Sequence, residues 1–252
     1  CFDLVAQGYA GIMHMTGDPD GPPTFAGIAV ADNNAGVHAF AAIGHALFHR
    51  ERTGEGTHLD IAMVDSLFHF QEEAIHAASM DPEFVAMRSG REHPSIAPAG
   101  TFRAPDGWVT ILCTEAQVRN LWAAMGQPEL VDDPRFDTNP HRTAHRREIR
   151  VLIERWMATF DTYDEVLAAL AASRVPSGPV LAPGDALTHP HFVERGLVRT
   201  VEDPLAGSVA LPAFPFRSTS PLPPDDYETA ALGEHNAEVL VEILGLSQER
   251  VA

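Results

Sequence analysis

The sequence predicts an α/β protein, because stretches typical of strands alternate with stretches typical of helices. Residues 27–31 are short and apolar, residues 37–49 are apolar and Ala-rich, and residues 57–63 alternate apolar and polar side chains. Residues 64–79 then return to helical spacing. The expected order in this part is strand, loop, helix, strand, helix. The chain of 252 residues is long enough to bury a substantial core and exceeds the usual size of a single domain.

Local signals predict where the first helices begin and end. A helix is expected over residues 3–14, at the start of the chain. The helix over residues 37–49 is expected to end within residues 50–56, where charged side chains are followed by glycine. Residues 80–90 interrupt the helical pattern and lead into a proline-containing loop, which indicates a domain boundary.

The second part of the chain predicts a hairpin followed by helices. Strands are expected at residues 100–103 and 108–113, joined by a turn. Thr162 and Glu165 have the spacing of a capping box, which favours a helix start there. The other expected elements are helices over 115–125, 138–160 and 162–173, two strands around 204–207, a proline-rich run over 212–224 and a helix over 234–244.

Composition excludes several classes of function. The formal net charge of −18 disfavours a nucleic-acid partner, since a phosphate backbone would be repelled. No apolar run approaches the roughly 20 residues of a membrane-spanning helix. All 17 basic residues are Arg, so neither a Schiff-base lysine nor a P-loop is present. The two cysteines form no disulfide framework and no signal peptide is recognisable, so a cytoplasmic location is expected.

The 13 histidines raise the question of a metal site. Two pairs at i,i+4 spacing, His45 with His49 and His141 with His145, would each share one helix face. Neither pair has the intervening Glu of a zinc protease, and the two cysteines are far apart in sequence. We expect no metal. Glycines at 17, 21, 54 and 56 do not precede a helix as a dinucleotide motif requires, so no nucleotide redox cofactor is expected either.

Asp32 is the candidate nucleophile. It follows the apolar residues 27–31 and precedes the expected helix, and open strand ends in α/β proteins are where ligands bind. Asn33 and Asn34 are amide donors beside it, and Gly36 permits close approach of another molecule. The simpler interpretation is that Asp32 only caps the helix, as Asp commonly does at this position.

Several motifs, in a shared order along nearly the whole chain, resemble those of the class III CoA-transferases. This group contains formyl-CoA transferase, carnitine CoA-transferase and alpha-methylacyl-CoA racemase. The motifs are DLVAQ (3–7), MTGDPDGPP (15–23), the Asp32 loop, HRERTGEG (49–56), HPSIAP (93–98), GTF (100–102), DGW (106–108), DPRF (133–136) with Asn139, VPSGPV (175–180) and LGEHNAEVL (232–240).

The resemblance implies a Rossmann-like large domain, incomplete here, and a smaller α+β domain. It assigns residues 1–82 to the large domain, 83–192 to the small domain, and 193–252 to a segment that returns to the large domain. Family members have well over a hundred further residues before the point that corresponds to Cys1, and these supply much of the coenzyme A site. We therefore expect the 252 residues alone to bind CoA poorly. An interlocked homodimer, in which two ring-like chains pass through one another, is the implied assembly.

The implied substrates are an acyl-CoA and a small carboxylic acid, with no tightly bound cofactor. Asp32 would attack the thioester, giving a mixed anhydride and then an aspartyl-CoA thioester. Asn33, Asn34 and Gly36 are candidates for stabilising oxyanions. Met63 would line the CoA pocket, or else simply pack in the core. His93 and Ser95, in the loop over residues 93–98, would face the acyl group, or else belong to a proline-stiffened connector.

Two alternatives remain. A racemase of the same family would use Asp32 and Glu115, with a histidine located before Cys1, to move the proton alpha to a thioester. Glu115 has a simpler interpretation as an acidic residue in the first turn of a helix, where the helix dipole favours it. The other alternative is a truncated, non-catalytic subunit that retains the fold and serves a complete partner.

Overall fold

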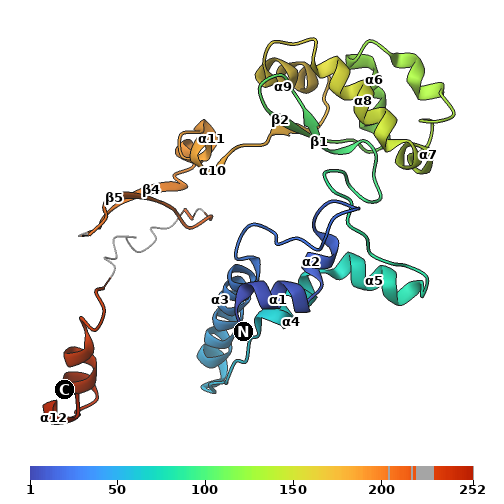
Figure 1. Cartoon of the computed structure of the whole chain (residues 1–252). Coiled ribbons are helices and arrows are strands. Elements are labelled where there is room, and N and C mark those ends of the chain that lie inside the picture. The colour runs from blue at the N-terminus through green and yellow to red at the C-terminus, as the bar shows by residue number, and fades with distance from the viewer. Residues whose placement is uncertain (204, 217, 220–229, 252) are drawn as a thin grey trace. The chain divides into compact units, whose positions relative to one another are not determined.

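The computed structural model describes residues 1–203, 205–216, 218–219 and 230–251 (Figure 1). The described chain divides into two compact units, Cys1–Val180 and Leu181–Ala252. Each unit is treated by itself below. None of the helices in the described ranges is long and apolar enough to cross a membrane.

The first part of unit Cys1–Val180 is helical (Figure 1). The helix expected over residues 3–14 is broken by Gly11, which has φ of +91° and separates two short helices. The long helix ends as predicted, at Gly54 in the left-handed conformation, whose N–H donates to the carbonyl of Arg50. The helices are α1 (Asp3–Tyr9), α2 (Ile12–Met15), α3 (Val30–Thr53), α4 (Met63–Phe70) and α5 (Glu72–Met80).

The prediction of strands at residues 27–31 and 57–63 is wrong. Val30 and Ala31 already belong to α3, and Met63 begins α4, while residues 57–62 join no described strand. A strand needs a neighbour for its backbone hydrogen bonds, and the apolar pattern alone does not supply one. The described part of residues 1–98 contains no strand, so the Rossmann-like arrangement of the large domain stays a prediction.

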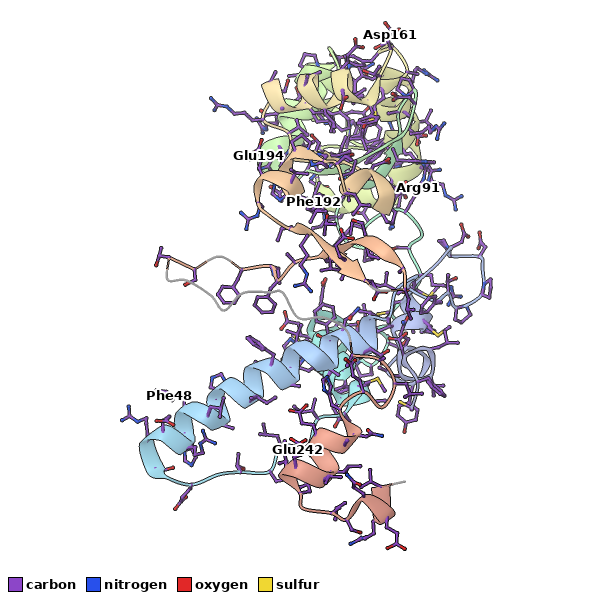
Figure 2. All side chains as sticks on the ribbon, turned by 90° about the vertical axis from the view of Figure 1, so that its left-hand side faces the viewer. Phe48, Arg91, Asp161, Phe192, Glu194 and Glu242 are labelled. Atoms are coloured by element: carbon purple, nitrogen blue, oxygen red, sulfur yellow. The ribbon has the colours of Figure 1, made fainter. Side chains whose placement is uncertain are left out.

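Helices α1, α3 and α4 enclose only a small core, formed by the buried side chains of Ala6, Ala31 and Leu67. Helix α3 nevertheless exposes a row of large apolar side chains, of which Figure 2 labels Phe48. A contiguous apolar surface of this kind is typical of an interface. The exposed side chains are Val37, Phe40, Ile43, Leu47 and Phe48.

The second part of this unit is an α+β arrangement, as predicted. Three antiparallel strands form a sheet in the order β1-β2-β3. The hairpin turn lies where it was expected, with the Ala104 N–H donating to the Gly107 carbonyl. The elements are β1 (Ala99–Arg103), β2 (Trp108–Leu112), α6 (Glu115–Ala124), a 3-10 turn (Pro128–Asp132), α7 (Asn139–Ala144), α8 (Arg146–Met157), α9 (Tyr163–Ala172) and β3 (Ser177–Pro179).

This α+β part has the main hydrophobic core of the described chain, in which sixteen buried residues form one cluster. Trp122 and Phe136 are among its largest buried side chains, with ring centroids 6.0 Å apart. The cap predicted from sequence is present, because the Thr162 hydroxyl accepts from the Glu165 N–H. The structure adds a capping box of Thr114 and Gln117 at the start of α6, which was not predicted. The single helix expected over 138–160 is interrupted at His145, between α7 and α8.

Cys113 directly follows β2 and is fully buried. Burial raises the pKa of its thiol to about 12, and the charge of Arg142 offsets this only partly. Because the thiolate is the reactive form, Cys113 should not react with a thiol reagent at pH 8 in the folded protein, whereas the exposed Cys1 should. Titration with Ellman's reagent, before and after adding denaturant, measures this, and prompt reaction of Cys113 in the native state would contradict it.

Unit Leu181–Ala252 contains the two strands expected around residues 204–207, paired antiparallel with Val201 opposite Val209. The helix expected over 234–244 begins later than predicted and forms a π-helical stretch. Residues 217 and 220–224 of the predicted proline-rich run over 212–224 lie outside the described residues. The elements of this unit are α10 (Pro183–Ala186), α11 (Pro190–Glu194), β4 (Val198–Asp203), β5 (Gly207–Pro212), the π-helical η2 (Glu238–Ile243) and α12 (Gln248–Val251).

Candidate active site

Asp32 lies in the first turn of α3, as its third residue, and its side chain is exposed. The helix is not capped by Asp32 but by Asp3 of α1. The Asp3 Oδ1 atom accepts from the N–H groups of Ala31 at 2.7 Å and Asp32 at 3.4 Å. Among the described residues, no side chain or backbone group is hydrogen-bonded to the Asp32 carboxylate. The capping role is therefore filled by another residue, and the Asp32 carboxylate is available to solvent.

Gln7 completes the support of this helix start. It is fully buried, and its Nε2 donates to Asp3 Oδ2 at 2.6 Å and to the Ile28 carbonyl at 3.0 Å. Its Oε1 accepts from the Ala26 N–H at 3.2 Å. Asp3 and Gln7 thus fasten the segment that leads into Asp32. Both residues belong to the DLVAQ motif, and their i,i+4 spacing places them on one face of α1, but no role was predicted for either.

Asn33, Asn34 and Gly36 differ in how well they are placed to donate a hydrogen bond to an oxyanion beside Asp32. Asn34 Nδ2 donates to the Ser66 carbonyl at 2.8 Å and so ties α3 to α4. Gly36 lies beyond the first helical turn, where each N–H is directed to the carbonyl four residues earlier. Space around Gly36 is open, which permits close approach of another molecule. Asn33 is the best-placed donor of the three, because its side chain is exposed in the first turn of the helix.

Met63 is the first residue of α4 and is partly buried against the small core of Ala6, Ala31 and Leu67. This contact agrees with the core-packing interpretation of Met63. Its role in a CoA pocket stays a prediction.

His93, Ser95 and Glu115 belong to a second group of contacts. The Ser95 N–H donates to His93 Nδ1 at 3.2 Å, and Ser95 Oγ lies 3.3 Å from the same atom. The Asn139 amide contacts this loop on both sides of Ile96, because its Nδ2 donates to the Ser95 carbonyl at 2.8 Å and its Oδ1 accepts from the Ala97 N–H at 3.1 Å. Asn139 is part of a motif of the sequence, but no role was predicted for it.

Glu115 is connected to this loop through Arg142. The side chain of Arg142 is 2% exposed, and its guanidinium donates to the carbonyls of Ala97 at 2.8 Å and Phe136 at 3.0 Å. Its Nη2 forms an ion pair with Glu115 Oε1. The Glu115 carboxylate is thus occupied as the counter-ion of a buried charge, which is a structural role. The sequence offers no signal for Arg142, because its partners are 6 to 45 positions away.

The family described as CoA-transferase family III matches residues 1–236. The succinyl-CoA:mesaconate CoA-transferase of Haloarcula hispanica is 36% identical over 253 residues, which cover 99% of this chain and 63% of that protein. The succinyl-CoA–D-citramalate CoA-transferase of Chloroflexus aurantiacus is 33% identical, with 100% of this chain and 62% of that protein covered. The crystal structure of a CAIB/BAIF family protein from Brucella suis is 33% identical with a TM-score of 0.78, and the match covers 96% of this chain and 62% of that one.

The chain belongs to CoA-transferase family III. This confirms the resemblance to the class III CoA-transferases. The chain spans less than two thirds of the length of these relatives.

Proposed function

We propose that the protein transfers coenzyme A from an acyl-CoA thioester to a small carboxylic acid, with Asp32 as the nucleophile. The single observation that carries the proposal is the exposed Asp32 carboxylate on a helix start that Asp3 caps in its place. Both protein relatives described above are named for transfer from succinyl-CoA, which favours the thioester of a dicarboxylic acid as the donor. The proposed assembly is a homodimer, and the apolar face of α3 supports it.

The proposed reaction proceeds by two carboxylate–thioester exchanges. The Asp32 carboxylate attacks the acyl carbon, the C–S bond breaks, and CoA leaves as a thiolate, so that a mixed anhydride of Asp32 and the donor acid remains. The thiolate attacks the aspartyl carbonyl, which releases the donor's acid as a carboxylate and leaves an aspartyl-CoA thioester. The acceptor carboxylate then attacks the aspartyl carbonyl of this thioester and expels the CoA thiolate, which gives a second mixed anhydride. The thiolate attacks the acceptor's acyl carbon in this anhydride, which yields the new acyl-CoA and the free Asp32 carboxylate. Every intermediate is an activated acyl group, so no ATP is consumed.

The surroundings of Asp32 suit this chemistry. The first turn of a helix has a partial positive charge that favours a carboxylate there. Asn33 offers an amide to a developing oxyanion, and the open space around Gly36 admits the thioester. The racemase alternative receives no support from Glu115, because its carboxylate is paired with Arg142.

The proposed reaction predicts a covalent intermediate on Asp32. Incubation of the full-length protein with succinyl-CoA, followed by hydroxylamine, should convert Asp32 to a hydroxamate, because anhydrides and thioesters both react with this nucleophile. Mass spectrometry of the peptide that contains Asp32 measures the modification. Omission of succinyl-CoA is the control. An unmodified peptide together with solvent deuterium at the alpha carbon would indicate proton abstraction instead.

A further inference from the structure

We propose that Gln7 is a positioning residue for the nucleophile, because it fixes the backbone that leads into Asp32 and thereby the direction in which the Asp32 carboxylate points. The inference rests on the proposed CoA transfer and adds to it a residue that controls the rate of attack on the thioester. Gln7 is fully buried, so it does not act by touching the substrate. Its effect is exerted through Asp3 and through residues 26–28.

The segment that enters α3 is held by hydrogen bonds rather than by packing. Residues 22–29 are all exposed, so burial of their side chains contributes little to their conformation. Gly27 has a φ of +84°, and no atom beyond its chain neighbours lies within 4 Å of the place where a Cβ would be. Because glycine adopts other conformations readily, this turn keeps its shape only if the residues on either side of it are held.

Gln7 holds both sides of the turn at Gly27. Its Oε1 accepts from the Ala26 N–H, and its Nε2 donates to the Ile28 carbonyl. The other hydrogen of Nε2 is donated to Asp3 Oδ2. Two donated bonds and one accepted bond require an amide, since an ionised carboxylate has no proton to donate and an apolar side chain offers neither group.

Asp3 transmits this restraint to the start of α3. Its Oδ2 accepts from Gln7, while its Oδ1 accepts from the N–H groups of Ala31 and Asp32. Gln7 thus fixes the rotation of the Asp3 carboxylate, and this carboxylate fixes the first turn of the helix. Displacement of a reacting group by about 1 Å can lower a rate about a hundredfold, so loss of Gln7 should act on the rate of attack by Asp32.

The test compares Gln7→Met with Gln71→Met in the full-length protein. Gln71 is a matched control, because its side chain is also buried and its Nε2 donates to two backbone carbonyls. None of the hydrogen bonds of Gln71 in the described chain reaches residues 26–32. Methionine has a similar length and volume, so both variants should fold with similar losses of thermal stability.

The measured quantity is the rate at which succinyl-CoA and hydroxylamine modify Asp32. In Gln7→Met the maximal rate should fall about tenfold to a hundredfold, because the nucleophile is misplaced. The succinyl-CoA concentration that gives half of this rate should change by less than about twofold, since Gln7 does not bind the thioester. In Gln71→Met both quantities should stay within about twofold of the wild type.

A second variant, Gln7→Glu, distinguishes positioning from a general contribution to stability. Asp3 is the acidic group in contact with position 7, and Asp32 is the next acidic group along these contacts, so both disfavour a further negative charge there. Glu at position 7 would therefore share a proton with Asp3. With the proton it can donate to Asp3 and accept from Ala26, whereas without it the donor is lost.

The rate of Gln7→Glu relative to the wild type should consequently fall as the pH rises and the shared proton is lost. The relative rate of Gln7→Met should not depend on pH, because methionine does not titrate. Measurement of both ratios between about pH 5 and pH 9 tests this. A ratio for Gln7→Glu that does not change with pH would overturn the inference.

Hydrogen exchange of the Ala26 and Ala31 N–H groups separates failure of this inference from failure of the proposed function. Both should exchange faster in Gln7→Met and not in Gln71→Met, whether or not the protein transfers CoA. Equal losses of rate in the two variants, or a loss confined to the half-saturating concentration, would overturn the inference. A wild-type protein that exchanges as expected but is not modified at Asp32 would overturn the proposed function and leave Gln7 as a structural anchor only.

Discussion

Replacement of Asp32 by Asn is expected to abolish CoA transfer, with a loss of kcat of about a thousandfold or more, as for the removal of other covalent nucleophiles. The amide has nearly the shape of the carboxylate but cannot form the anhydride. Because Asp3 caps α3, the substitution removes only the interaction of a charge with the helix dipole, about 0.3–1 kcal/mol. The folded state should therefore persist. Rate measurements with succinyl-CoA and thermal unfolding together check both statements.

Asp65 provides a matched control for this experiment. It is exposed and is the third residue of α4, the position that Asp32 has in α3. Asp65→Asn should have the same small effect on stability and retain activity. If the Asp32→Asn variant kept most of its activity, or if Asp65→Asn lost as much, Asp32 would be an ordinary first-turn acid and the proposed mechanism wrong.

Replacement of Arg142 by Ala should destabilise the α+β part by about 3–5 kcal/mol, the range observed when one member of a buried charged network is removed. The substitution leaves the carbonyls of Ala97 and Phe136 without their donor and opens a cavity. Glu115→Gln should cost less, because the Glu115 side chain is 66% exposed and water replaces part of the lost pairing. The expected order of destabilisation is thus Arg142→Ala above Glu115→Gln.

Denaturant unfolding followed by tryptophan fluorescence measures this effect selectively. The three tryptophans, Trp108, Trp122 and Trp156, all lie between β1 and β3 and report on this part of the chain. Arg119→Ala is the control, because Arg119 is exposed on α6 and surface substitutions change stability by about 0.5 kcal/mol or less. A loss of similar size in the Arg119→Ala and Arg142→Ala variants would contradict the role assigned to the buried guanidinium.

Local signals explain which elements the sequence predicted well. Gly54 ends α3, Thr162 begins α9, and the turn between Arg103 and Trp108 forms the hairpin, because each depends on residues only a few positions apart. The strands expected at residues 27–31 and 57–63 failed for the opposite reason. A strand is specified by a partner elsewhere in the chain, which periodicity does not reveal.

In the candidate site, too, contacts between residues that are far apart in the sequence were not predicted. Asp32 was predicted to follow a strand and precede a helix, but it is the third residue of α3, and its role as the nucleophile stays a prediction. The residue that caps the helix in its place, Asp3, is separated from it by nearly thirty positions. Asn139 and Arg142 reach the loop over residues 93–98 across more than forty. Such contacts depend on the tertiary fold and have no local signature.

The late position of β3 affects the order in which this protein folds. Ser177 pairs with Ile111 of β2, although α6, α7, α8 and α9 all lie between the two strands in sequence. During synthesis β3 is therefore the last of the three strands to be made, and the hairpin of β1 and β2 is complete before β3 can pair with it. Closing a chain segment of this length costs entropy, and helices that form inside the segment shorten the distance to be closed. The helices and the apolar side chains that they contribute are thus expected to condense on the hairpin first, with the edge strand added as the final step.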